Sequence, residues 1–281
     1  MIVYTTDPHT PHPRQALTFN PTPTDHRPNM EWDAPAIVLD ARPYGETDMI
    51  ATVMTADHGL HKGLAKGGAS RAQAALWQAG NFAQIRWTAR LADQLGAFRG
   101  EMIHPNAALV MDDPLALAML SAVCATAEGA LPEREPHPAV FAGLLRLIAH
   151  LPQGAEMLAD LVRWEATLLM ELGYGLDLGS CAATGATTGL THVSPRTGRA
   201  VSWEAAEPYK DKLLKLPGFL TGGNTATADD HKNGLRLTGH FLARDAFGLR
   251  HRPLPQARLM LYDRVAALAE SDVPPGADHA G

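Results

Sequence analysis

The side chains that could carry out catalysis do not form a recognisable catalytic set. Ser180-Cys181 lies in a predicted loop, but the G-x-S-x-G turn that presents a nucleophilic serine does not surround it. His58 and His61 flank the start of a predicted strand, without an H-E-x-x-H helix or a carboxylate cluster nearby. The glycine-rich run 66–70 (KGGAS) lacks the G-x-x-x-x-G-K-[ST] order of a phosphate-binding loop. These residues offer no reason to propose an enzyme.

Metal binding is also weakly supported. A structural zinc site normally uses four Cys or His ligands, arranged as two close pairs. Residues 178–204 contain only Cys181 and, later, His192, and Thr184 stands where a C-x-x-C motif would place its second cysteine. Cys124 and Cys181 give no disulfide framework and indicate a reducing compartment. We expect no metal and no cofactor, with Cys181 a partly buried free thiol.

Basic side chains, in contrast, are concentrated in one stretch. Residues 42–99 contain seven basic and four acidic side chains, whereas residues 101–177 contain three basic and eleven acidic ones. The formal net charge of −6 argues against a basic coat, so an anion-binding surface has to be local. Each cation alone could be an ordinary solvated charge, but the set favours a nucleic-acid-binding face. We expect phosphate contacts from Arg42, Lys62, Lys66, Arg71, Arg86 and Arg90, with Tyr44 and Trp77 as candidate stacking rings.

These cations lie on predicted short strands. Residues 36–42, 47–55 and 60–66 are apolar runs separated by turns, and residues 81–91 alternate, with Trp87 facing inward and Arg86 and Arg90 outward. Several short strands in about 70 residues, with glycines that allow sharp bends, predict a five-stranded barrel of the OB type. We place this domain at residues 30–105.

After Pro105 the apolar pattern becomes helical, so the predicted fold class is α+β. Asp113 is placed as an N-cap with Pro114 at the first helical position. The helical domain is predicted over 106–270, with an irregular insert at 178–204. Further helices are expected at about 114–131, 139–151, 155–172, 203–216, 235–247 and 255–269, with a mobile loop at 222–233.

The two ends of the chain have no such periodicity. Residues 1–29 are rich in Pro, Thr and His and lack the apolar core of a secretion signal, so we expect a disordered extension, and we expect the same of the tail at 271–281. No apolar run is long enough to cross a membrane.

A second basic cluster follows near the C-terminal end. Its arginines alternate with Leu237, Phe241 and Phe247, whose helical spacing is explained by core packing. The arginines could bind phosphates or capture an acidic partner peptide, and the pattern does not decide between them. The residues expected to do so are Arg236, Arg244, Arg250 and Arg252.

Several strings resemble the RecO family of DNA repair and recombination-mediator proteins. In the first half these are AIVLDARPYGETDMIATVMTADHGLHKGLAKGGAS and LWQAGNFAQIRWTARLADQLGAF. In the second half they are ELGYGLDLGSCAATG, VSPRTGRAVS and KLLKLPGFL. Each motif is moderately specific by itself, and their order from about residue 32 to residue 261 is strongly so.

The resemblance implies an N-terminal OB-fold and a helical domain that carries a small zinc-ribbon-like insert. It also implies binding of single- and double-stranded DNA, annealing of complementary strands, and loading of recombinase onto DNA coated with single-strand-binding protein. The implied partners are RecR and the acidic C-terminal tail of single-strand-binding protein, in the cytoplasm at the nucleoid. No catalytic residue is implied. Because only Cys181 remains of the cysteine pairs found in metal-binding members, the chain fits the metal-free branch.

Two other classes of function stay open on the residues alone. The barrel and the acidic helices could form a protein scaffold within a repair complex that does not touch DNA. A metal-dependent nuclease or deaminase built on a similar barrel is a further alternative, although no ligand cluster supports it.

Overall fold

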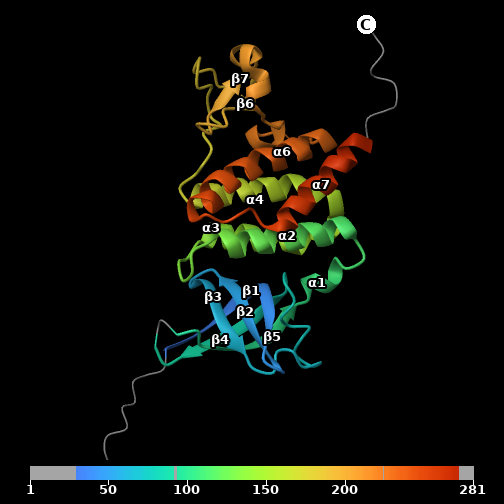
Figure 1. Ribbon diagram of the computed structural model, residues 1–281. Coiled ribbons are helices and arrows are strands. Elements are labelled where there is room, and N and C mark those ends of the chain that lie inside the picture. Colours follow the sequence, from blue (N-terminus) through green and yellow to red (C-terminus); the bar gives the residue numbers. More distant parts are fainter. Residues whose placement is uncertain (1–29, 92–93, 224, 272–281) are drawn as a thin grey trace, which may run out of the picture.

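The computed structural model describes residues 30–91, 94–223 and 225–271, so our expectations for residues 1–29 and for the tail beyond Ser271 lie outside it. The described chain forms three tiers: strands at one end, stacked helices in the middle, and a small sheet at the other end (Figure 1). The predicted α+β class is confirmed.

The first tier is an OB-like sheet. Its strands are hydrogen-bonded in the order β1-β2-β3-β5-β4, and the sheet closes into a barrel because β4 also pairs with β1. Strand β5 pairs antiparallel with β4 and, over two residues, parallel with β3. The strands are β1 (Met30–Tyr44), β2 (Asp48–Thr55), β3 (Gly59–Ala65), β4 (Phe82–Ala89) and β5 (Ala97–His104).

Alternation along β4 fills the barrel as predicted. Ile85 and Trp87 are buried, and Arg86 between them is exposed. Trp77, which we expected to be a stacking ring, is only 4% exposed and stacks on Phe98 at a centroid distance of 6.1 Å. That expectation is wrong, because the segment between β3 and β4 folds back and places Trp77 in the barrel core.

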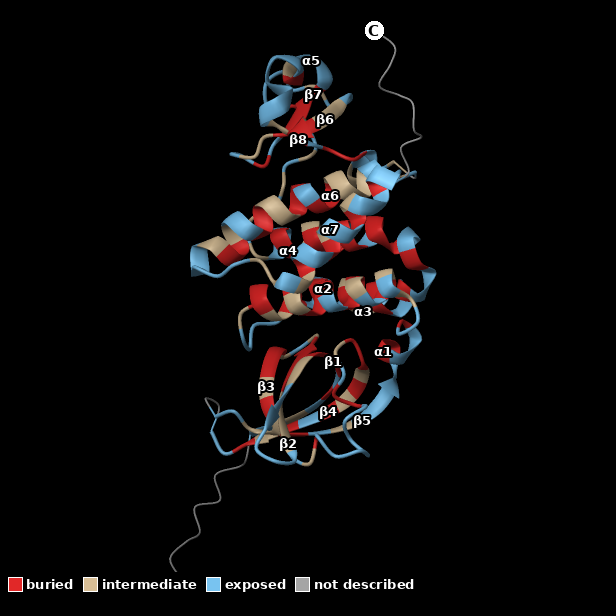
Figure 2. Ribbon diagram, turned by 45° about the vertical axis from the view of Figure 1, so that its right-hand side comes forward, coloured by how far each residue is buried: buried red, intermediate tan, exposed pale blue. Residues whose placement is uncertain are grey.

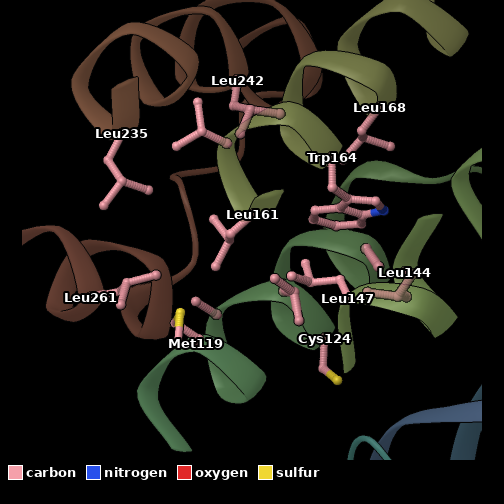
Figure 3. Close-up of a cluster of buried hydrophobic side chains, with 14 of the residues drawn as sticks. Met119, Cys124, Leu144, Leu147, Leu161, Trp164, Leu168, Leu235, Leu242 and Leu261 are labelled. Atoms are coloured by element: carbon pink, nitrogen blue, oxygen red, sulfur yellow. The ribbon is translucent and has the colours of Figure 1, made fainter. Parts of the chain in front are cut away.

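The second tier is a stack of helices around a common apolar core (Figures 1 and 3). Asp113 caps α2 as predicted, accepting hydrogen bonds from the backbone N–H groups of Leu115 at 2.8 Å and Ala116 at 3.0 Å. Leu144, Leu161 and Trp164 meet in the core. The helices are α1 (Asn106–Leu109), α2 (Pro114–Ala130), α3 (Pro138–His150), α4 (Leu158–Glu171), α6 (Ala228–Phe241) and α7 (Gln256–Ser271).

A buried ion pair crosses this core. Arg258 of α7 donates to both carboxylate oxygens of Glu165 on α4, and each side chain is 1% exposed. Arg258 also donates to the backbone oxygen of Leu235 on α6 at 2.7 Å, and the hydroxyl of Thr238 donates to Glu165. The pair therefore joins three helices through one hydrogen-bonded network.

The insert forms the third tier and is longer than predicted. Strands β6 (Leu190–Val193), β7 (Ala200–Ser202) and β8 (Leu214–Lys215) make a sheet in the order β7-β6-β8. The helix expected at 203–216 is wrong in its second half. Only α5 (Trp203–Ala206) and a 3₁₀ turn over Glu207–Lys212 are helical, because Leu214 and Lys215 pair with β6 instead.

The loop expected at 222–233 is also shorter than predicted. Helix α6 begins at Ala228, where the side chain of Thr227 accepts from the backbone N–H of Asp230 and Asp230 accepts from the backbone N–H of Thr227. This capping box uses Asp in place of the usual Glu or Gln, which is why the sequence pattern did not reveal it.

Main-chain contacts join the barrel to the helices. The backbone N–H of Arg134 donates to the carbonyl of Leu60 on β3 at 2.8 Å, and Lys62 forms an ion pair with Glu133 at 2.7 Å. At Gly59, a Cβ would lie 2.1 Å from the carbonyl oxygen of Glu135, and φ is +66°. Only glycine fits that position. Figure 2 shows buried residues on both sides of this seam.

An aromatic cluster lies beside the seam. His61 contacts Trp32 and Trp87 edge-on, with ring centroids 5.2 and 5.5 Å apart, and its Nδ1 atom is buried without a hydrogen-bond partner. Burial first, and then the positive charges of Arg134 and His58, lower the pKa of His61 from 6.5 to about 4. The folded barrel therefore holds His61 neutral.

Within the described residues, the structure contains no helix that is both long enough and apolar enough to span a membrane.

Breaking the buried ion pair on one side should cost more than removing both charges. Arg258→Met leaves the Glu165 carboxylate buried and unpaired, and we expect a loss of about 3–5 kcal/mol in the free energy of unfolding. The double variant Glu165→Leu/Arg258→Met should lose much less. Urea unfolding at pH 7 measures both, with Arg264→Met on the exposed side of α7 as control. Equal losses in the single and double variants would contradict this account.

Acid should destabilise the barrel through His61. In the unfolded chain the imidazole binds a proton below about pH 6.5, whereas folded His61 stays neutral down to about pH 4. The unfolded state therefore binds more protons in this window, so the free energy of unfolding is fully retained above pH 6.5 and falls toward pH 4. Urea unfolding across this range should give a shallower pH dependence for His61→Phe than for the wild type. The exposed-site control His251→Asn should keep the wild-type slope.

Candidate nucleic-acid interface

Three cations meet on the outer surface of the barrel. A surface pocket of about 660 Å³ lies where β3 ends and β4 and β5 run together. Lys66, Arg86 and Arg99 line it, with Thr88, Ala97 and Phe98 as the other lining residues. None of these described lining residues is acidic, so the pocket offers a locally positive surface, which we call the barrel pocket.

The strand register explains how the barrel pocket forms. Arg86 on β4 lies directly opposite Arg99 on β5, and like charges in such a position repel each other. Glu31 on β1 relieves part of this repulsion through an ion pair with Arg86 at 2.8 Å. Lys66 and Arg99 form no ion pair within the described part of the chain. A bound anion would therefore stabilise this arrangement of charges.

The other predicted phosphate contacts lie apart from this pocket. Arg42 on β1 is exposed and pairs with Asp40 at 2.9 Å. Lys62 on β3 pairs with Glu133 across the seam to the helical domain. Arg71 and Arg90 are exposed, the first between β3 and β4 and the second just after β4. The structure thus brings two of the six predicted residues together, Lys66 and Arg86, and leaves the other four around the barrel.

The pattern along residues 97–104 did not identify Arg99. Gly100 interrupts the alternation of apolar and polar residues there, and the four residues after it are all exposed. The sequence of this strand therefore does not show which side chains face the barrel core and which face outward. The only usable signal was the basic charge itself. Among the rings, Tyr44 is 57% exposed at the end of β1 and remains available for stacking.

The arginines predicted to capture a peptide lie in three places. Arg250 and Arg252 donate to the backbone oxygens of Ala130 and Gly129 at the end of α2, at 2.9 and 3.2 Å. Arg244 pairs with Asp245 and donates to backbone oxygens at 195–196. Arg236 is exposed on α6. They form no common binding surface, and three of them hold the backbone in place.

A groove that combines cations with apolar lining lies instead between α3 and α4. It has a volume of about 690 Å³, and Arg146 and Arg163 contribute its positive side chains, with His150 beside them. Its one acidic lining residue, Asp160, pairs with Arg163 at 2.7 Å. The apolar and small lining residues include Ala139, Ala142, Gly143, Leu147, Met157 and Trp164. We call this the α3–α4 groove.

The insert does not fit a zinc ion. Cys181 is buried, and its sulfur accepts hydrogen bonds from the backbone N–H of Ser202 at 3.2 Å and from the Ser202 hydroxyl at 3.4 Å. Hydrogen bonds from Ser202 and Thr184 lower the pKa of this thiol to about 6. Among the described residues, no three His, Cys, Asp or Glu side chains lie close enough to hold a metal. Hydrogen bonds to Cys181, and not bonds to a metal, therefore hold this turn of the insert in place.

Comparison with known proteins gives a consistent result over most of the chain. Residues 30–106 match the family model described as Recombination protein O N terminal, and residues 111–253 match Recombination protein O C terminal. The chain is 58% identical over 246 residues to the DNA repair protein RecO of Granulibacter bethesdensis, which covers 86% of this chain and 98% of that protein.

Two further relatives agree. The DNA repair protein RecO of Gluconacetobacter diazotrophicus is 54% identical over 256 residues, covering 89% of this chain and 99% of that protein. That of Acidiphilium cryptum is 53% identical over 249 residues, covering 86% and 98%. Since both domains match in order and the relatives align over nearly their whole length, this chain belongs to the recombination protein O (RecO) family.

Proposed function

We propose that this protein is a non-enzymatic recombination mediator in DNA repair. It binds single- and double-stranded DNA without reading sequence, anneals complementary strands, and helps load recombinase onto DNA coated with single-strand-binding protein. It acts in the cytoplasm at the nucleoid. The observation that carries the proposal is the barrel pocket, where Lys66, Arg86 and Arg99 gather without an acidic lining residue among those described. The names of the relatives, all DNA repair proteins, support the same role.

The chemistry of the barrel pocket suits an annealing protein. Lys and Arg bind phosphate oxygens and release counterions, which supplies affinity that does not depend on base sequence. Phe98 in the pocket is only 3% exposed, so no base can stack on it. A small pocket whose cations bind the phosphates that every strand carries accepts strands of any sequence, and its modest charge allows the duplex to leave after pairing.

The α3–α4 groove suits the acidic tail of a partner. A peptide that is acidic and ends in apolar residues needs cations around an apolar hollow, and Arg146 and Arg163 beside Ala142 and Gly143 supply both. We therefore propose that the tail of single-strand-binding protein binds here, rather than at the arginines of the C-terminal cluster. RecR is the second proposed partner.

DNA binding should depend on the barrel pocket. The double variant Lys66→Gln/Arg99→Gln removes two cations that have no ion-pair partner in the described chain, and it should weaken binding of labelled single-stranded DNA several-fold at low salt. The plot of log affinity against log salt should flatten by about 0.7 per lost phosphate contact. The matched control Arg196→Gln/Arg264→Gln loses the same charge at exposed positions elsewhere.

The same titration separates the mediator from a scaffold that does not touch DNA. The wild-type protein should bind DNA with a steep salt dependence and anneal complementary oligonucleotides without nucleotide or metal. Absence of binding by the wild type at low salt would favour the scaffold. Equal losses in the pocket variant and the control would show that only net charge matters. Cleavage or base conversion after addition of Mg²⁺ or Zn²⁺ would revive a nuclease or deaminase.

Peptide binding should depend on the α3–α4 groove. Arg146→Glu reverses an exposed charge at this groove, so binding of a labelled acidic peptide with an apolar C-terminal end should weaken several-fold. Arg264→Glu on α7 should bind like the wild type, and DNA affinity should change little in either variant. Fluorescence anisotropy measures both ligands, and a weakening by Arg264→Glu equal to that by Arg146→Glu would contradict the assignment.

A further inference from the structure

A second cation-lined groove lies at the other end of the molecule. It lies between the insert and α6 and has a volume of about 690 Å³. Its positive side chains are Lys210, Lys215, Lys232 and Arg236, which come from the insert and from α6. Figure 1 shows the insert and the barrel at opposite ends, separated by the helices, so this groove is distinct from the barrel pocket. We call it the insert groove.

Acidic side chains balance part of the positive charge of the insert groove. Of its three acidic lining residues, Asp230 caps α6 and Asp229 pairs with Lys232 at 3.5 Å. The third is Asp211, on the exposed 3₁₀ turn. Lys215 and Arg236 are exposed and have no ion-pair partner among the residues that the structure describes. Lys210 pairs with Glu207 at 3.1 Å, so Lys215 and Arg236 are the described lining cations that remain to bind an anion.

His192 lines the groove beside a cation. His192, on β6, is paired in register with Lys215 on β8. Burial first, and then the charge of Lys215, lower the pKa of His192, while Glu207 opposes this more weakly. The lowered pKa favours the neutral imidazole, so His192 adds no positive charge to the groove, and Lys215 and Arg236 are the groups that can hold phosphates.

An exposed ring completes the groove. Trp203, the first residue of α5, lines it and is 56% exposed, and Tyr209 on the following 3₁₀ turn is 61% exposed. Leu216 and Pro217, in contrast, are buried. The accessible apolar surface is thus a flat ring rather than a hollow for an aliphatic side chain. Flat rings beside free cations are the combination that binds unpaired bases and their phosphates.

We infer that the insert groove is a second single-strand-binding site, in which Lys215 and Arg236 hold phosphates and Trp203 stacks on a base. The inference rests on the proposed single-strand binding by the barrel pocket, and it adds that one molecule holds two strands at once. Single strands are flexible, so two strands tied to one molecule meet at a far higher effective concentration than in free solution. Annealing is accelerated without any contact that reads sequence.

A bridging experiment tests this with the full chain. One biotinylated oligonucleotide is fixed on beads, protein is added, and a second, labelled and non-complementary oligonucleotide is offered. The wild type should retain the second strand. The triple variant Trp203→Ala/Lys215→Gln/Arg236→Gln should still bind the fixed strand but retain several-fold less of the second. All three side chains are exposed, so thermal melting should match the wild type.

The control removes equal charge outside the groove. Lys212→Gln/Arg264→Gln, which keeps Trp203, should retain the second strand as the wild type does. Light scattering on the same samples should show one protein mass with and without the mutations, so that loss of a dimer does not explain a loss of bridging.

The other possible results of the bridging experiment each overturn either the second site or the proposed function. Failure of the wild type to bind the fixed strand would overturn the proposed function as a whole. Binding of the fixed strand without retention of the second, or equal retention by wild type and triple variant, would overturn only the second site. Loss of acidic-peptide binding in the triple variant, with strand retention unchanged, would assign the insert groove to a protein partner and also overturn it.

Discussion

The buried ion pair between Arg258 and Glu165 is the interaction on which the arrangement of the molecule depends. It ties α7 to α4 and, through the backbone of Leu235, to α6. Helix α7 also packs on α2, which contacts β1 of the barrel, and α6 contacts β8 of the insert. Two charges removed from water are tolerated because they pair with each other and both carboxylate oxygens accept hydrogen bonds, and a network of this kind accepts few alternative packings. The helical tier is therefore a defined spacer between the barrel and the insert.

The helical tier keeps positively charged surfaces of the molecule apart from one another. The chain is acidic overall, yet its free cations are found in separate places: the barrel pocket, the α3–α4 groove and the insert groove. Several other basic side chains make structural contacts, as where Lys62 pairs with Glu133 and Arg250 donates to the backbone at the end of α2. Local positive surfaces on an otherwise acidic protein attract phosphates at defined points, while the acidic remainder of the surface does not bind DNA. The annealing role that we propose requires this balance, because strands must be held and then released.

Sequence reasoning succeeded where local rules were obeyed and failed where distant segments met. The alternation around Arg86 and Trp87 and the Asp113 cap followed from period and propensity, and the structure confirms them. Leu214 and Lys215 continue a helical pattern but form a strand, because β6 supplies a hydrogen-bonding edge that lies more than twenty residues away. Trp77 had no periodic context, so its place in the barrel core was decided by the fold of the segment around it.

By itself, the sequence determined the α+β class, the order of the two domains, the family to which they belong and the stretch of chain in which the cations gather. These properties follow from the periodicity of residues within short stretches of the chain and from the order of the motifs. Only the tertiary structure decided that Arg99 joins Lys66 and Arg86, that the C-terminal arginines separate, and that Lys215 and Arg236 face one groove. The physical reason is that register between strands and contact between tiers depend on segments distant in sequence, and no local pattern encodes which cations become neighbours.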